Sequence, residues 1–168
     1  KLLTFSRQTA LNFTDTDVNH LIQEVVTLVE YEATQAHKQV VLNFEPDLPV
    51  IQADRDQLGQ AFLNFTLNAL DAMSADNRLE ICTNSAPDEA SIEICFQDTG
   101  SGIPTDVLNK IFEPFYTTKG TGKGTGLGLA ICQGIIEAHF GRIQVESRIG
   151  VGTQFHIHLP IQEKGRRA

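Results

Sequence analysis

The feature that most constrains this chain is a glycine-rich stretch that runs directly into a helical pattern. Residues 120–131 read GTGKGTGLGLAI, and the apolar spacing then continues through Ile135, which predicts a helix over about 127–139. A helix that begins this way offers unpaired N–H groups and a partial positive charge to an anion. Lys119 and Lys123 add positive charge. We interpret residues 119–126 as a lid that closes over the phosphates of a nucleotide.

Other glycine-rich phosphate loops do not match the spacing. A Walker A loop requires Ser or Thr after its Gly-Lys pair, whereas Gly124 follows Lys123 here. The dinucleotide fingerprint requires glycines at offsets of two and five, and no three glycines between 120 and 128 have those offsets. A disordered glycine linker has a similar composition, but such a linker does not usually continue into an apolar-periodic helix.

Length and charge limit the class of protein. The chain has 168 residues, of which 41% are hydrophobic, enough for one domain with a full core. Its net charge of −8 argues against a nucleic-acid or membrane-surface binder, because both need a basic face. No apolar run reaches the roughly 18 residues that a spanning helix needs, so we expect a cytoplasmic segment, whether or not a longer parent protein is membrane-anchored. The three cysteines lack metal-ligand spacing and are expected to be reduced and buried.

The remaining patterns predict alternating helices and strands in one domain. Residues 13–161 are expected to form this domain, with 1–12 ending an upstream helix and 162–168 forming a polar tail. An N-cap within TDTD (14–17) precedes the first long helix. Predicted helices cover about 18–36, 56–73, 104–111 and 127–139, and predicted strands cover 40–45, 50–53, 79–84, 91–98, the residues from 143, and 155–159.

Three polar residues in the second long helix fall on one face. Asn64, Asn68 and Asp71 are separated by about one turn, and leucines border them, so the stripe is not expected to face open water. Asparagine is a mediocre helix former, and its amide can ligate Mg²⁺ or contact phosphate. A solvated polar stripe is the alternative interpretation.

Asp98 ends a predicted strand immediately before the Gly100–Gly102 turn. A carboxylate in that position can accept a hydrogen bond from a ligand amine, although Asp-Thr-Gly also has an ordinary turn composition. Phe112, Phe115 and Tyr116 are expected to pack beside the lid and to anchor it. The five histidines are scattered without metal-ligand partners, and His139 is expected to end a helix rather than to act in catalysis.

Five segments together resemble the N, G1, F, G2 and G3 boxes of the catalytic ATP-binding domain of bacterial two-component sensor histidine kinases, in the GHKL superfamily. In order they are LNFTLNALDA, DTGSGIP, IFEPFYTTK, GTGLGLAI and SRIGVGTQFHIHLP. The leading LLTFSR resembles the end of a dimerisation and histidine-phosphotransfer helix. The resemblance implies an α+β class and the Bergerat fold, a two-layer α/β sandwich with a mixed, mostly antiparallel sheet and helices on one face.

The resemblance also implies roles for residues of this chain. Asn68 would ligate Mg²⁺ between the phosphates of ATP, Asn64 would assist catalysis there, and Asp98 would bind the adenine amino group. Which lid lysine contacts the terminal phosphates stays open. The residues implied to contact the nucleotide are Asp98, Gly100, Gly102, Ile103, Phe112, Tyr116, Lys119, Lys123, Gly124, Thr125, Gly126, Leu127, Gly128, Leu129 and Thr153.

The implied activity is transfer of the γ-phosphate of Mg-ATP to a histidine on a separate domain. Two departures stand out: Asp71 lies near a position where many members have Lys, and the phospho-acceptor box is expected upstream of Lys1. The implied partners are an upstream dimerisation and histidine-phosphotransfer domain and the receiver domain of a response regulator.

Two other functions remain open at this point. One is an ATP-hydrolysing conformational switch, and the other is a non-catalytic nucleotide-sensing module. The switch proteins of the superfamily have a glutamate where Asn64 stands, so negligible intrinsic ATPase activity is expected.

Overall fold

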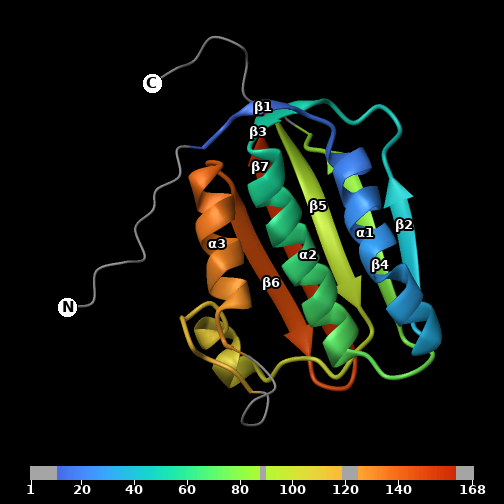
Figure 1. The fold of residues 1–168 in the computed structure, drawn as a ribbon. Helices are drawn as coiled ribbons and strands as arrows, with labels where there is room; N and C mark the ends of the chain where they lie inside the picture. The colour runs from blue at the N-terminus through green and yellow to red at the C-terminus, as the bar shows by residue number, and fades with distance from the viewer. Residues whose placement is uncertain (1–10, 88–89, 119–124, 162–168) are drawn as a thin grey trace.

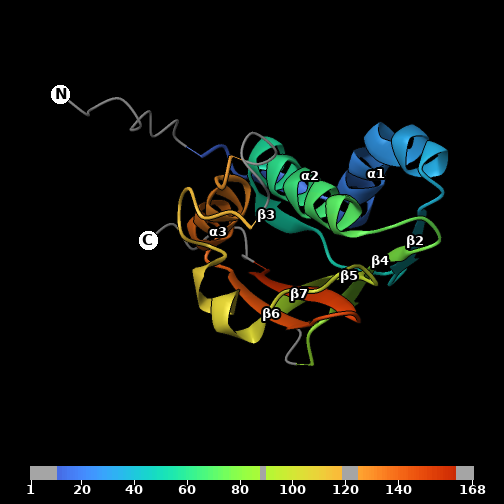
Figure 2. The ribbon, with the colours of Figure 1, turned by 90° about the horizontal axis from the view of Figure 1, so that it is seen from below.

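The computed structural model describes residues 11–87, 90–118 and 125–161. They form two layers, a sheet and a set of helices that covers one of its faces (Figures 1 and 2). The elements are β1 (Thr14–Thr16), α1 (Val18–Gln35), β2 (Gln39–Phe44), β3 (Ile51–Ala53), α2 (Arg55–Ala72), β4 (Arg78–Ser85), β5 (Ser91–Asp98), the 3-10 helix η1 (Thr105–Lys110), α3 (Gly128–Ala138), β6 (Arg142–Arg148) and β7 (Gly152–Pro160).

The main sheet has five strands in the order β2-β4-β5-β7-β6. β2 pairs with β4 in parallel and the other three pairs are antiparallel, which confirms the mixed, mostly antiparallel sheet. β1 and β3 pair separately as a two-stranded sheet, and β1 was not predicted. The TDTD segment also supplies the expected cap, because the Asp17 side chain accepts a hydrogen bond from the backbone N–H of His20 at 3.0 Å.

The core lies between the helices and one face of the sheet. α2 is the central helix and contacts both α1 and α3 (Figure 1). Phe62 and Phe65 of α2 are fully buried against Phe96 of β5, with ring centroids 6.0 and 5.4 Å apart. Phe155 of β7 lies 5.2 Å from Phe65. Alternate strand residues are buried, as period-2 patterning dictates for a sheet covered on one side.

The opposite face of the sheet carries polar side chains. His156 and Glu93 form a cross-strand pair with 2.6 Å between Nδ1 and Oε1. Cys82 and Cys95 are directly opposite each other in β4 and β5, and both thiols are free. Cys82 is half-buried, so the expectation of buried thiols holds for Cys95 and Cys132 but not for Cys82. No helix in the described parts of the chain is long and apolar enough to cross a bilayer.

α3 ends close to the predicted position, and the chain turns immediately after it. Phe140 takes the left-handed turn with φ +59°, and the N–H of Gly141 donates to Ile136 O at 2.9 Å. His139 is the C-cap, as expected, and it is buried. Its Nδ1 lies 2.7 Å from Ile135 O, and its Nε2 accepts a 2.9 Å hydrogen bond from the N–H of Asp54, the N-cap of α2.

Some predictions fall outside the described residues. These are most of the helix predicted over 1–12, and the tail predicted over 162–168. Only Leu11 and Asn12 of the first segment are described, and neither is helical.

Candidate functional site

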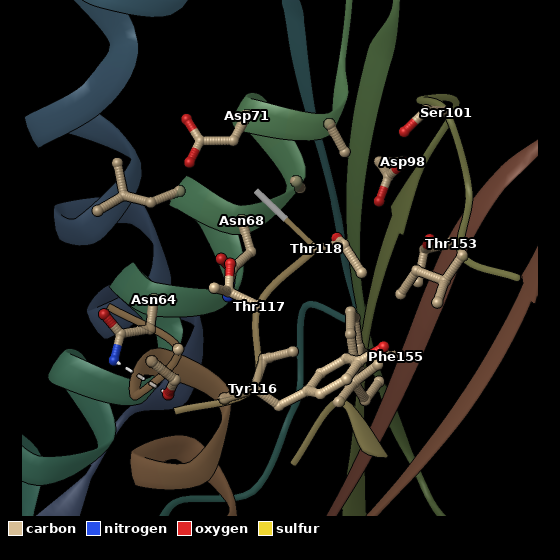
Figure 3. Close-up of a pocket in the computed structure, with 18 of the residues that line it drawn as sticks. Asn64, Asn68, Asp71, Asp98, Ser101, Tyr116, Thr117, Thr118, Thr153 and Phe155 are labelled. Atoms are coloured by element: carbon tan, nitrogen blue, oxygen red, sulfur yellow. Dashed lines mark hydrogen bonds between the residues drawn. The ribbon is translucent and has the colours of Figure 1, made fainter. Parts of the chain in front are cut away.

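A cavity of about 450 Å³ opens at one end of the two layers. Its walls come from the second half of α2, the start of α3, the segment around Tyr116–Thr118, and the neighbouring ends of β5 and β7 (Figure 3). The volume lies within the range of small-molecule sites. The chain therefore brings together residues from five separate segments at one pocket.

The α2 wall carries the predicted polar stripe. Figure 3 shows Asn64, Asn68 and Asp71 along the helix on the same side of the cavity, which all three line, and only Asp71 of the three is exposed. The Nδ2 of Asn64 reaches Gly128 O of α3 at 3.5 Å. Asn64 also forms a hydrogen bond with the Cys132 thiol, whose pKa is raised to about 12 because burial disfavours the thiolate. These contacts hold Asn64 between the two helices.

The sheet wall centres on Asp98, which is only 5% exposed. Its Oδ1 accepts a 2.8 Å hydrogen bond from the N–H of Gly100, and the backbone of Thr153 also donates to its carboxylate. Burial raises the pKa of Asp98, and these two N–H groups oppose part of that effect. Asp98 and Thr153 are cross-strand partners, so both side chains lie on the same face of the sheet.

A serine that sequence reasoning missed lies directly behind this wall. The hydroxyl of Ser147 in β6 accepts from the N–H of Ile103 at 2.7 Å and lies 2.8 Å from the hydroxyl of Thr153. It also donates to Gly152 O at 2.9 Å. Ser147 thus joins the turn after β5 to the β6–β7 hairpin. Ser147 is the first residue of the SRIGVGTQFHIHLP segment, but its place near the end of a strand does not indicate which groups its hydroxyl contacts.

Two positions at the pocket require glycine, because the backbone there passes very close to the backbone of another segment. Gly102 has φ +72°, and a Cβ there would lie 2.2 Å from Arg148 O. Gly126 has φ +66°, and a Cβ there would lie 2.4 Å from the backbone carbon of Phe115. Only glycine tolerates both conditions. The packing of the pocket walls already accounts for these glycines, without a ligand.

The three aromatic residues before the lid differ in placement, and the prediction that all three pack there is wrong for Phe115. Phe112 packs on the core, 6.4 Å from the ring of Phe155. Tyr116 lines the pocket. Phe115 has a positive φ of +68°, its N–H donates to Gly126 O at 2.9 Å, and its side chain is 75% exposed.

The start of α3 points its positive end into the cavity. Gly128 and Leu129 line the pocket, and among the described residues no side chain caps the helix at Leu127. The hydroxyl of Thr125 accepts a 3.4 Å hydrogen bond from the N–H of Leu127. The first turn of α3 thus faces the cavity, where the glycine pattern predicts N–H groups that bind an anion.

Most of the predicted contact residues line the pocket. Those that do are Asn64, Asn68, Asp98, Gly102, Ile103, Tyr116, Thr125, Gly126, Gly128, Leu129 and Thr153. Gly100, Phe112 and Leu127 lie beside it without lining it. Lys119, Lys123 and Gly124 lie outside the described residues.

Sequence reasoning missed several lining residues. They are Leu67, Ala69, Ala72, Ser101, Ile111, Thr117, Thr118 and Phe155. Phe155 also packs in the core, where its ring centroid lies 5.2 Å from that of Phe65. Phe155 belongs both to the core and to the pocket lining, because the pocket is continuous with the core at this end.

The donor set of the pocket suits a hard cation that is shared with a ligand. Within the described ranges, no group of three or more His, Cys, Asp and Glu side chains could hold a metal ion alone. The oxygens that α2 offers are the amides of Asn64 and Asn68 and the carboxylate of Asp71. Mg²⁺ takes few protein ligands and is commonly bound together with substrate phosphates.

Comparisons with known proteins agree with this architecture. The family model of "Histidine kinase-, DNA gyrase B-, and HSP90-like ATPase" matches residues 53–163. The signal transduction histidine-protein kinase AtoS of Escherichia coli (strain K12) is 39% identical over 167 residues, 99% of this chain and 27% of AtoS. The chain spans between 22% and 34% of the length of the first curated relatives that it matches.

Solved structures show the same fold. The nucleotide-free catalytic domain of histidine kinase ThkA has a TM-score of 0.80 at 32% identity, covering 89% of this chain and 96% of that domain. The structure of ThkA in complex with response regulator protein TrrA has a TM-score of 0.76 at 28% identity, covering 92% of this chain and 43% of that chain. The structure of full-length ShkA in complex with AMPPNP has a TM-score of 0.80 at 30% identity, covering 89% of this chain and 31% of that chain.

Proposed function

Because this chain belongs to the family of histidine kinase-, DNA gyrase B- and HSP90-like ATPases, we propose that it is the catalytic ATP-binding part of a sensor histidine kinase. It binds Mg-ATP and transfers the γ-phosphate to a histidine on a separate dimerisation and phosphotransfer domain. The observation that carries this proposal is the pairing, across one cavity, of a buried carboxylate on the sheet with an amide-bearing helix face.

The sheet side is the adenine end in this proposal. The carboxylate of Asp98 accepts a hydrogen bond from the amino group of adenine, while Ile103 and Tyr116 supply apolar contact to the base. A buried acceptor that already has two backbone donors is held in a fixed orientation, which favours one ligand geometry.

The α2 and α3 side is the phosphate end. N–H groups at the start of α3 donate to phosphate oxygens, and Lys119 or Lys123 adds positive charge. Asn68 holds Mg²⁺ through its amide oxygen, with Asn64 assisting one turn earlier. When bound, Mg²⁺ supplies neutralisation of charge on the phosphates. Asp71 adds negative charge at this wall, so the cationic groups of the lid contribute more of the neutralisation.

Phosphoryl transfer to a histidine needs positioning more than proton removal. Neutral imidazole is already a nucleophile near neutral pH, and the transition state is stabilised chiefly by placed charge. Asn64 can orient a phosphate or a water but does not act as a general base. The pocket residues therefore fit a reaction in which an incoming imidazole is the acceptor.

The proposed partners are the upstream dimerisation and phosphotransfer domain, which presents the histidine, and the receiver domain of a response regulator. The complex of the related ThkA with response regulator TrrA supports the second partner. We place the reaction in the cytoplasm, where ATP is available and where three free cysteines stay reduced.

The test combines binding with transfer. The chain is titrated with a fluorescent ATP analogue with and without Mg²⁺, and is then mixed with ATP and a histidine-containing dimerisation domain of a related kinase. We expect Mg²⁺-enhanced binding in the wild type, loss of that enhancement in Asn68→Ala, and acid-labile phosphate on the added domain. Binding without any transfer to a histidine domain would instead favour a nucleotide-sensing module.

A further inference from the structure

The hydroxyl of Ser147 makes three polar contacts within 3 Å. The N–H of Ile103 lies 2.7 Å away, Gly152 O lies 2.9 Å away, and the hydroxyl oxygen of Thr153 lies 2.8 Å away. A serine hydroxyl has one proton to donate and two lone pairs that accept. Three contacts therefore use its full hydrogen-bonding capacity.

Only one arrangement of protons makes all three contacts hydrogen bonds. The N–H of Ile103 is a donor, so Ser147 accepts there, and Gly152 O is an acceptor, so Ser147 donates its proton there. The contact with Thr153 is then attractive only if Thr153 donates to Ser147. The Thr153 proton is thus directed behind the pocket wall.

This assignment determines what Thr153 offers to a ligand. Thr153 lines the cavity and is the cross-strand partner of Asp98. With its proton committed to Ser147, the Thr153 hydroxyl presents only lone pairs to the cavity. The carboxylate of Asp98 is likewise an acceptor. The base end of the pocket therefore presents two neighbouring acceptors (Figure 3).

We propose that Ser147 is a specificity-determining residue that makes the pocket select a 6-aminopurine nucleotide over a 6-oxopurine nucleotide by fixing Thr153 as an acceptor. This inference rests on the proposed function, and it identifies the residue that sets the preference for a 6-aminopurine nucleotide. The amino group of adenine donates two hydrogen bonds. The 6-oxo group of hypoxanthine is an acceptor, so it meets two acceptors that cannot donate to it, and unpaired polar groups disfavour binding.

Removing the Ser147 hydroxyl releases the Thr153 proton. In Ser147→Ala, Thr153 can rotate its O–H toward the cavity and donate to a 6-oxo group. ATP and ITP differ at this edge of the base, and their ribose and phosphates are identical. The ratio of their dissociation constants therefore isolates the effect on the base from any general weakening of the site.

The experiment measures ATP and ITP binding to the whole chain by calorimetry or by displacement of a fluorescent ATP analogue. We expect the wild type to prefer ATP, and we expect Ser147→Ala to reduce the ATP-over-ITP ratio about fivefold, the worth of one neutral hydrogen bond. Ser147→Thr keeps a hydroxyl and should keep the wild-type ratio. Ser91→Ala, at the far end of the same sheet, is the matched serine control.

A double substitution tests whether Ser147 acts through Thr153. In a Thr153→Val background there is no hydroxyl to redirect, so adding Ser147→Ala should leave the ATP-over-ITP ratio unchanged. An equal loss of affinity for both nucleotides in Ser147→Ala, or the same change of ratio in the Thr153→Val background, would overturn the inference and leave ATP binding intact. Failure of the wild type to bind ATP would overturn the proposed function together with it.

Discussion

At the scale of single residues, two buried polar side chains, His139 and Asp98, differ in the surroundings in which they are buried. His139 is 2% exposed, and both its ring nitrogens are within hydrogen-bonding distance of backbone groups, at Ile135 and Asp54. Asp98 is 5% exposed, and its protein donors are two backbone N–H groups at a wall of the cavity. Burial raises the pKa of Asp98, so the folded protein without ligand holds its charged form at a free-energy cost.

Asp98→Asn should therefore separate stability from binding. The folded-state pKa of Asp98 lies above its unfolded value, so the native state binds this proton more tightly. The contribution of Asp98 to stability is then present below the unfolded pKa of 3.8 and is lost as pH rises through the folded pKa. We expect nucleotide-free Asp98→Asn to unfold at or above the wild-type temperature at neutral pH, while its ATP affinity falls on the order of thirtyfold or more.

Thermal unfolding between about pH 4 and pH 8 checks the predicted effect on stability, and titration with ATP checks the predicted loss of affinity. Asp47→Asn, at an exposed aspartate outside the pocket lining, is the matched control. A clear loss of stability in nucleotide-free Asp98→Asn at neutral pH would show that the carboxylate is structural, contrary to this view.

Local sequence patterns predict single residues only where a periodic element positions them. Asn64 and Asn68 were found because helical spacing places them on one face of α2, and the structure confirms that face. Ser147 was missed because its contacts join β6, the start of β7 and the turn after β5, which are brought together only by sheet pairing. The left-handed φ values of Phe115 and Phe140 were missed as well, because such values normally indicate glycine.

At the scale of elements, the helices and the strands of the main sheet follow the sequence pattern closely. The predicted ends of α1 and α2 are correct to within a residue, and Asp17 and Asp54 cap the N-termini of these helices. β1 was missed, since three residues are too few to show alternation, and it pairs with the equally short β3. The parallel pairing of β2 with β4 follows from the crossover through β3 and α2, and no local pattern reports it.

Gly126 of the G2 box and Gly134, later in α3, provide a test at this scale. Gly134 lies on the exposed side of α3, and a Cβ there would meet nothing within 4 Å. Gly134→Ala should stabilise the protein by about 0.5–1 kcal/mol, because alanine loses less backbone entropy in a helix. Gly126→Ala should destabilise it by about 1–3 kcal/mol, since φ is +66° and the new Cβ would contact Phe115.

Chemical denaturation of both variants and nucleotide titration give the comparison. We expect Gly126→Ala to lose nucleotide affinity as well, because Gly126 lines the pocket and its carbonyl holds Phe115. Gly134→Ala should bind as the wild type does. Equal behaviour of the two variants would contradict the close approach seen between Gly126 and Phe115.

At the scale of the whole molecule, the two layers close at one end and open at the other. β1 and β3, with the contact between His139 and Asp54, close the end at which α2 begins (Figure 1). The cavity opens where α2 ends and α3 begins. The amides of Asn64 and Asn68 line this open end, so in the proposed reaction the acceptor histidine approaches the phosphates from here.

The isolated chain should accordingly bind ATP and hydrolyse it very little. Asn64 stands where the ATPase switches of the superfamily have a glutamate, and an amide does not take a proton from water. Release of inorganic phosphate by the wild type is expected to match that of Asn68→Ala, which sets the background. Fast turnover that Asn68→Ala abolishes would favour an ATPase switch over a histidine kinase.

The strand order has a consequence for how the chain is synthesised. β7 is the last strand in the sequence, yet it lies inside the sheet between β5 and β6. Until a ribosome has released residue 160, β6 has no neighbour, and Asp98 has no cross-strand partner at Thr153. Strand pairs that are distant in sequence form late. In the nascent chain β2, β4 and β5 can pair with one another earlier, but β6 joins the sheet and the Asp98–Thr153 wall of the pocket forms only after β7 has been synthesised.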